Sequence, residues 1–196
     1  QWTVRAGYTG LEFLAGVPGL VGGAARMNAG SPQLGIGAFI TSLLCLDATG
    51  RIVTRQASRV AWGYRHCGLR DPVILAVQLR LRRQRPAISA ELARQALRKK
   101  SASQPLAAWS AGCFFRNPPN ASAGQLIDKA GLKGARIGGA LVSPRHANFI
   151  INTGGATSSD VLALARRVRR RVHARFGVAL DPEIRFWPGA NPSEGE

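Results

Sequence analysis

Cysteine is scarce in this sequence, whose 196 residues contain Cys45, Cys67 and Cys113 as the three cysteines. Their wide and unrelated spacing excludes both a disulfide framework and a zinc-finger site. A chain without such cross-links fits a reducing compartment, so we predict a cytoplasmic protein.

Long hydrophobic runs are also missing. No stretch approaches the roughly 20 apolar residues that cross a bilayer, and no basic-then-apolar signal peptide is present. We therefore expect no membrane partner. The sequence begins at Gln1 and runs directly into strand-like residues at 2–4, as if an earlier segment preceded it. At 45% hydrophobic it has enough apolar residues for one large or two small folded domains.

Acidic residues are few. The chain carries 10 of them against 27 basic residues, which gives a formal net charge of +17. Such a balance fits an anionic partner, whether nucleic acid, acidic lipid or a phosphorylated small molecule. An arginine-rich composition also follows from a GC-rich genome, so the charge does not choose among these interpretations.

Glycine, by contrast, is concentrated near the start. Five glycines fall within 15 residues, at Gly16, Gly19, Gly22, Gly23 and Gly30. This density excludes a regular helix or strand. Free backbone N–H groups behind such glycines suit a phosphate, although the dinucleotide-binding Gly-x-Gly-x-x-Gly spacing is absent.

The remainder of the first half predicts a hairpin, a strand and a helix. We expect the hairpin strands at residues 39–47 and 51–55, an ordered loop at 62–67, and an alternating strand at 73–81. The charged stretch at 82–86 is a domain-boundary candidate. Ser89 is predicted to cap a helix at 90–100, followed by a linker at 101–105.

The second half predicts a helix at residues 122–130, strands at 135–142 and 148–152, and a long helix from Thr157 to Phe176. A capping signature opens the long helix and Gly177 ends it. Its apolar residues repeat at helical spacing, and its arginines are interpreted as a solvated face. A last strand is expected at 181–187, followed by a loose tail at 191–196.

We predict the catalytic site at residues 110–118, with the sequence Ser-Ala-Gly-Cys-Phe-Phe-Arg-Asn-Pro. Gly112 permits close backbone approach. Cys113 carries a thiol with an ordinary pKa of about 8.5, so it is mostly protonated at neutral pH. Alternation along a strand would place Cys113 and Phe115 on one face and Phe114 and Arg116 on the other. The alternative is a buried cysteine in a phenylalanine-rich strand.

A series of motifs in order along the chain resembles the UDP-N-acetylenolpyruvoylglucosamine reductase family, in its short-loop subtype. The motifs are Gly-Val-Pro-Gly-Leu-Val-Gly-Gly-Ala at 16–24, Met-Asn-Ala-Gly at 27–30, Gly-Tyr-Arg at 63–65, Gln-Pro at 104–105, Ala-Gly-Cys-Phe-Phe-Arg-Asn-Pro at 111–118, Ala-Gly-Gln-Leu-Ile at 123–127, Gly-Leu-Lys-Gly at 131–134, Ile-Gly-Gly-Ala at 137–140, His-Ala-Asn-Phe-Ile at 146–150 and Asp-Pro-Glu-Ile-Arg at 181–185. The resemblance implies an α+β fold that lacks the family's N-terminal FAD-binding subdomain. The chain would then consist of the remainder of a two-part FAD-binding domain (1–84), a helical linker (85–104), a smaller α/β substrate-binding domain (105–180), and a returning strand and tail (181–196).

The same resemblance implies a cytoplasmic, monomeric NADPH-dependent flavoprotein oxidoreductase. It would use FAD to reduce a UDP-linked enolpyruvyl amino sugar for bacterial peptidoglycan, and so serve cell wall biogenesis, cell shape and cell division. The catalytic residues would be Arg65, Cys113 and Glu183. The contacts to FAD would come from Gly19, Gly22, Gly23 and Asn28, and those to the substrate from Tyr64, Arg116 and Asn117.

Two alternatives remain beside this interpretation. The 196 residues are either an inactive fragment of such an enzyme, which would purify colourless, or a basic nucleic-acid-binding module. His146 is interpreted as a hydrogen-bonded structural residue.

Overall fold

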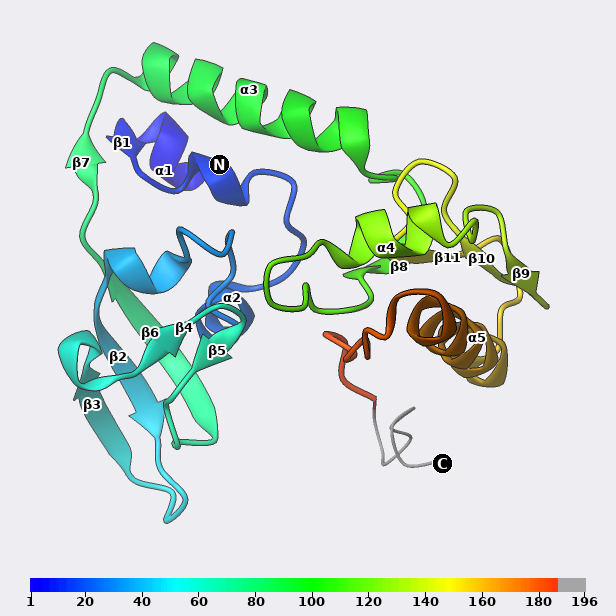
Figure 1. Ribbon diagram of the computed structural model, residues 1–196. Coiled ribbons are helices and arrows are strands. Elements are labelled where there is room, and N and C mark those ends of the chain that lie inside the picture. The colour runs from blue at the N-terminus through cyan, green and yellow to red at the C-terminus, as the bar shows by residue number, and fades with distance from the viewer. Residues whose placement is uncertain (187–196) are drawn as a thin grey trace. The chain divides into compact units, whose positions relative to one another are not determined.

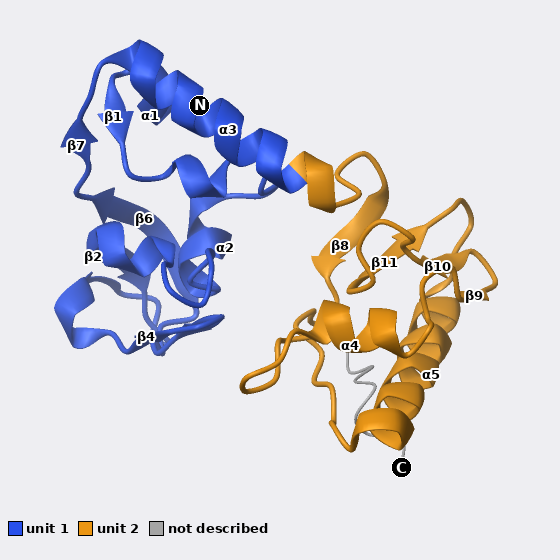
Figure 2. Ribbon diagram, turned by 45° about the horizontal axis from the view of Figure 1, so that its top comes forward, with its two compact units in different colours: residues 1–100 blue, residues 101–196 orange. Residues whose placement is uncertain are grey.

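The computed structural model describes residues 1–186, and the chain divides into two compact units after Lys100 (Figure 2). Unit 1 comprises residues 1–100, and unit 2 begins at Ser101. The domain limits expected from the family resemblance stay a prediction.

Unit 1 contains three small antiparallel sheets, in strand orders β1-β7, β3-β2-β6 and β4-β5 (Figure 1). Its helices are α1 Trp2–Arg5, η1 Glu12–Leu14, α2 Val21–Arg26, η2 Ile36–Phe39, η3 Ala57–Arg59 and α3 Pro86–Ser103, the last of which runs three residues past the division. Its strands are β1 Tyr8–Thr9, β2 Ile40–Leu46, β3 Ile52–Gln56, β4 Trp62–Gly63, β5 His66–Cys67, β6 Val73–Leu79 and β7 Arg82–Arg83.

The predicted hairpin and the strand after it are confirmed as β2, β3 and β6. Ile40, Leu43 and Cys45 of β2 are buried with Ala25 of α2, whereas Leu44 is 37% exposed. The core of unit 1 therefore lies on the α2 side of this sheet.

Several local predictions in unit 1 are wrong. Residues 2–4 form α1 and not a strand, because the Ala6 amide bonds to the Trp2 carbonyl and the Trp2 ring stacks on Tyr8 at 6.3 Å. Such local contacts override β propensity. The loop at 62–67 is a hairpin formed by β4 and β5.

Helix α3 starts at Pro86 and not at Ala90, since proline is tolerated in the first helical turn. Ser89 is therefore fully buried inside the helix and caps nothing. The helix also continues to Ser103, so most of the linker expected at 101–105 is helical.

Up to residue 186, unit 2 is a four-stranded antiparallel sheet in the order β8-β11-β10-β9 with the helices α4 and α5. Its strands are β8 Trp109–Cys113, β9 Arg136–Ile137, β10 Ala140–Val142 and β11 Phe149–Asn152, and its helices are α4 Ala123–Lys129 and α5 Ser158–Phe176. Helix α5 packs against β9, β10 and α4. The strand expected at 135–142 is broken at Gly138, whose φ of +51° lies in the left-handed region.

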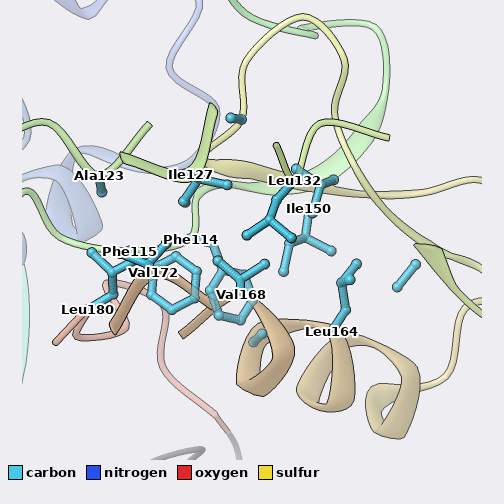
Figure 3. Packing of buried hydrophobic residues seen from close by; sticks show 14 residues of the cluster. Phe114, Phe115, Ala123, Ile127, Leu132, Ile150, Leu164, Val168, Val172 and Leu180 are labelled. Carbon is cyan, nitrogen blue, oxygen red and sulfur yellow. The ribbon is translucent and has the colours of Figure 1, made fainter. Parts of the chain in front are cut away.

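The core of unit 2 is built on one face of α5, as its helical spacing predicts. Leu164 and Val168 point toward Leu132 and Ile150 (Figure 3). The predicted cap is confirmed, because the Thr157 hydroxyl accepts from the Asp160 amide while the Asp160 carboxylate accepts from the Thr157 amide.

The strand predicted at 181–187 is reduced to one bridge within residues 1–186, between Pro182 and Phe115. Proline has no amide hydrogen, so a regular ladder cannot continue through this position. Trp187 and the tail expected at 191–196 lie outside the described residues.

Candidate active site

Residues 110–118, where the catalytic chemistry is predicted, begin at a β-bulge near the end of β8. Ser110 pairs with Ile151 and Cys113 pairs with Phe149, so Ala111 and Gly112 together oppose Ile150. Gly112 has a φ of +88°, and a Cβ there would meet nothing within 4 Å, so the backbone angle alone favours glycine. The bulge sets the direction in which the chain presents Cys113, which is half-buried.

The strand ends at Cys113, and the alternation expected beyond it does not hold. Phe114 and Phe115 were expected on opposite faces, yet both are buried in one cluster, with ring centroids 4.9 Å apart. The two rings anchor this segment in the core of unit 2, whereas Arg116 is exposed.

Asn148 holds the backbone of this segment from the β11 side. Its Nδ2 donates to the Phe115 carbonyl at 2.7 Å, and its Oδ1 accepts from the Phe115 amide at 2.9 Å. The Asn148 carbonyl also accepts from the Phe114 amide at 2.7 Å. Asn148 is only 3% exposed, so one buried side chain satisfies both polar backbone groups of Phe115.

Residues 181–183 bind the other side of the same segment. The Glu183 amide donates to the Phe114 carbonyl at 2.8 Å, and the Arg116 amide donates to the Asp181 carbonyl at 2.8 Å. Glu183 is therefore bonded to the residue that directly follows Cys113. The structure thus brings the backbone segments of two of the three predicted catalytic residues, Cys113 and Glu183, side by side from positions 70 apart in the sequence.

The neighbouring polar residues have structural partners of their own. The Asn117 Oδ1 accepts from the Ala123 amide at 3.0 Å and holds the start of α4, where Ser122 is the cap. The His146 Nδ1 accepts from the Asn148 amide at 3.3 Å, and burial lowers the pKa of this imidazole. This hydrogen bond is the kind of contact expected of the structural residue that His146 is predicted to be.

In unit 1, Asn28 connects three segments. Its Nδ2 donates to the Gly63 carbonyl at 2.8 Å and its Oδ1 accepts from the Gly37 amide at 2.9 Å. A Cβ at Gly35 would clash with the Asn28 side chain. The left-handed φ of +42° at Asn28 suits asparagine. Asn28 therefore ties the end of α2 to η2 and to the β4–β5 hairpin.

Arg65 and Tyr64 form the two-residue turn of that hairpin, between the paired residues Gly63 and His66. Arg65 has a φ of +52° and donates from Nη1 to the Gly30 carbonyl at 2.8 Å. Its guanidinium lies 5.0 Å from the centroid of the Tyr64 ring. A cavity of about 270 Å³ beside this turn is lined in part by Asn28, Tyr64 and Trp62.

The sequence predicts no regular helix in the glycine-rich stretch, but Val21–Arg26 form α2, so this prediction is wrong. The loop before α2 and the first turn of α2 have an open, apolar surface. Leu20 is 84% exposed, and Val17 and Val21 on either side of it are also exposed. A Cβ at Gly19 or Gly23 would meet nothing within 4 Å, so the backbone here is open to a ligand. These features fit a large, flat, partly apolar group such as a flavin, for which the glycines and Asn28 are predicted contacts.

Residues 1–186 contain neither a membrane-spanning helix nor a cluster of metal ligands. No helix there is long and apolar enough to span a membrane. No group of three or more histidine, cysteine, aspartate or glutamate side chains in that range is placed to hold a metal ion.

Comparison with known proteins shows to which family the chain is related. Residues 104–187 match the family described as "UDP-N-acetylenolpyruvoylglucosamine reductase, C-terminal domain". The chain is 43% identical over 183 residues to UDP-N-acetylenolpyruvoylglucosamine reductase of Chlamydia felis (strain Fe/C-56), covering 93% of the chain and 62% of that relative. It is 44% identical over 189 residues to the reductase of Anaeromyxobacter dehalogenans (strain 2CP-C), covering 96% of the chain and 57% of that relative.

The chain therefore spans less than two thirds of the length of these curated relatives. The crystal structure of UDP-N-acetylenolpyruvylglucosamine reductase from Thermus caldophilus is similar to the chain at a TM-score of 0.83 and 36% identity. The match covers 96% of the chain and 68% of the Thermus protein. Because the chain agrees with these proteins both in sequence and in its mixed helix-and-strand fold, it belongs to the UDP-N-acetylenolpyruvoylglucosamine reductase family.

Proposed function

We propose that this chain acts in the FAD-dependent reduction of UDP-N-acetylenolpyruvoylglucosamine to UDP-N-acetylmuramate, with NADPH as the reductant. The reaction would serve peptidoglycan synthesis in the cytoplasm. The observation that supports the proposal is the backbone bond from the Glu183 amide to the Phe114 carbonyl, which joins the segment of Glu183 to the residue that follows Cys113.

The substrate is a vinyl ether conjugated to a carboxylate. Adding hydride to its terminal carbon leaves negative charge on the carboxylate side, and the other carbon must then receive a proton. An enzyme for this reaction needs cationic or hydrogen-bonding groups against that charge and an acid within reach of the carbon.

Cys113 is proposed as the acid. A thiol with an ordinary pKa of about 8.5 is mostly protonated at neutral pH and gives up its proton far more readily than a hydroxyl. The bulge at Gly112 and the buried rings of Phe114 and Phe115 hold the backbone on both sides of Cys113. This rigidity keeps the thiol at a fixed place, as proton transfer requires.

Arg65 is proposed to bind the substrate carboxylate, since a planar guanidinium can donate two parallel hydrogen bonds to it. Glu183 is proposed to orient the donors around the developing charge. Tyr64, Arg116 and Asn117 are the proposed substrate contacts. Among residues 1–186 the Asn117 Nδ2 group has no acceptor, so it is available to a ligand even though its Oδ1 is engaged.

FAD, when bound and reduced by NADPH, would supply the hydride. Gly19, Gly22, Gly23 and Asn28 are proposed to hold it, supported by the open space at Gly19 and Gly23 and by the exposed apolar side chains around Leu20. Asn28 would act mainly through the shape of the loop, because both ends of its amide already bond to Gly63 and Gly37.

The test is NADPH oxidation that depends on added UDP-N-acetylenolpyruvoylglucosamine. The chain would be assayed fused to the part of the Thermus caldophilus enzyme that it does not cover, with that part alone as the blank. Replacing the acid, Cys113→Ala, should lower turnover by about 100-fold or more, while Cys113→Ser retains part of it. Cys67→Ala is the matched control and should stay near the starting rate. Full turnover by the Cys113→Ala protein would refute the proposal.

A further inference from the structure

A second cavity, of about 380 Å³, lies in unit 1 among β3, η3 and the connection between β5 and β6. Its polar lining residues are Thr54, Arg55, Gln56, Arg59, Arg70 and Asp71. The Arg65 turn and the glycine-rich loop do not line it, so the proposed reaction leaves this cavity without a role.

One wall of the cavity is held firmly by ion pairing and hydrogen bonding. Arg55 donates from Nε and Nη2 to the two carboxylate oxygens of Asp71, at 2.8 and 2.9 Å. Asp71 is only 7% exposed, and the arginine lowers the pKa of its carboxyl. From α2, Arg26 donates to the carbonyl oxygens of Leu69 and Asp71. The residues that face the cavity therefore stand on a fixed backbone.

The other two arginines of the cavity lining, Arg59 and Arg70, make no side-chain contact that stabilises the fold of residues 1–186. Arg59 and Arg70 are exposed, and among residues 1–186 their guanidinium groups have no hydrogen-bond or ion-pair partner. Arg55, Arg59 and Arg70 carry three positive charges and Asp71 carries one negative charge, which leaves a net charge of +2 on the lining.

The lining indicates what kind of ligand fits. A phosphate monoester carries about −1.5 to −2 at pH 7 and offers three strong acceptor oxygens, which matches this charge. Arginine suits such groups because its donors form a planar fork. No aromatic side chain lines the cavity, so it has no stacking surface for a nucleobase.

We propose that this cavity is a binding site for a phosphate monoester of a small molecule, or for free phosphate, separate from the proposed active site. Arg59 and Arg70 bind the phosphoryl oxygens, and the Arg55–Asp71 pair holds the wall behind them. The proposal does not depend on the reductase activity, because neither arginine belongs to the proposed catalytic or substrate-binding residues.

Isothermal titration of the 196-residue chain with inorganic phosphate, and separately with glucose 6-phosphate, tests the site. We expect saturable binding of at least one ligand that weakens as salt is raised. Arg59→Ala and Arg70→Ala should each weaken it about tenfold or more, the effect of losing one charged hydrogen bond. Arg51→Ala removes an exposed arginine outside the cavity and should change affinity less than about twofold.

The two ligands distinguish the sources of the phosphate. Tighter binding of glucose 6-phosphate supports a phosphorylated metabolite, and equal binding supports free phosphate. The absence of saturable binding to either ligand overturns the proposal. It is also overturned if Arg51→Ala weakens binding as much as Arg59→Ala does, since that result shows attraction to the overall charge only.

Discussion

Replacing Asn148 with alanine should destabilise unit 2 by about 3 kcal/mol. The substitution removes two buried hydrogen bonds, of 2.7 and 2.9 Å, and leaves both the amide and the carbonyl of Phe115 without a partner. Each buried polar group left unsatisfied costs about 1–3 kcal/mol, so the limits are about 2 and 6 kcal/mol. We expect a value in the lower half, because the smaller side chain lets water approach Phe115.

Urea unfolding followed by circular dichroism measures this change. With a slope of about 2 kcal/mol per molar urea, the midpoint for unit 2 should fall by about 1.5 M. Hydrogen exchange gives a local check, since the Phe115 amide should lose protection more than the amides of α5 do.

Asn152→Ala is the matched control for this prediction. Asn152 is exposed, and its Oδ1 accepts from two backbone amides, of Gly154 at 2.8 Å and Ala156 at 3.1 Å. Water can replace these bonds, so its loss should cost about 1 kcal/mol or less. If Asn148→Ala costs no more than Asn152→Ala, the reasoning about how Phe115 is held is refuted.

Two further predictions concern charge and backbone conformation. Because pairing with Arg55 lowers the pKa of Asp71, its contribution to stability is present above the unfolded pKa of about 3.9 and is lost as pH falls through the folded value. Urea unfolding at decreasing pH should show the free energy of unfolding of the parent chain fall, and that of Asp71→Asn fall less. If both proteins lose the same free energy in acid, the Arg55–Asp71 pair is not the cause of the acid sensitivity. Gly138→Ala and Gly177→Ala both place a side chain at positive φ, but only the first would clash with the Asp160 carboxylate. Thermal unfolding should show a cost of about 1 kcal/mol for Gly177→Ala and clearly more for Gly138→Ala, and equal costs would mean that the clash relaxes freely.

Elements set by local signals were predictable from sequence. The helix α5 carries its own cap at Thr157, its apolar period and its glycine stop, so its limits follow from nearby residues. The β2–β3 hairpin is similar, with a tight turn at Gly50 whose φ is +81°.

Contacts between distant segments could not be read in the same way. Nothing in the local sequence around Asn148 indicates that its side chain binds Phe115, 33 residues away. The pairing of Arg55 with Asp71 is equally hidden, because many arginines were available. A polar residue directly before an apolar strand, as Asn148 is before Phe149 and Ile150, is the one signal of a buried hydrogen-bond role.

The proposed site was predictable only in part for a related reason. The family resemblance selected Cys113 and Glu183, but it did not show that the backbone of residues 181–183 bonds directly to residues 114–116. That pairing depends on the end of β8 at Cys113 and on the single bridge at Pro182, neither of which periodicity reveals.

The most direct test of the account is a double-mutant cycle on Cys113 and Glu183, measured as kcat for substrate-dependent NADPH oxidation in the fused protein. Residues that act as one unit give strongly non-additive effects. We predict that Cys113→Ala combined with Glu183→Gln is no slower than the slower single variant. If the two losses instead multiply, Cys113 and Glu183 act independently and the shared site is contradicted.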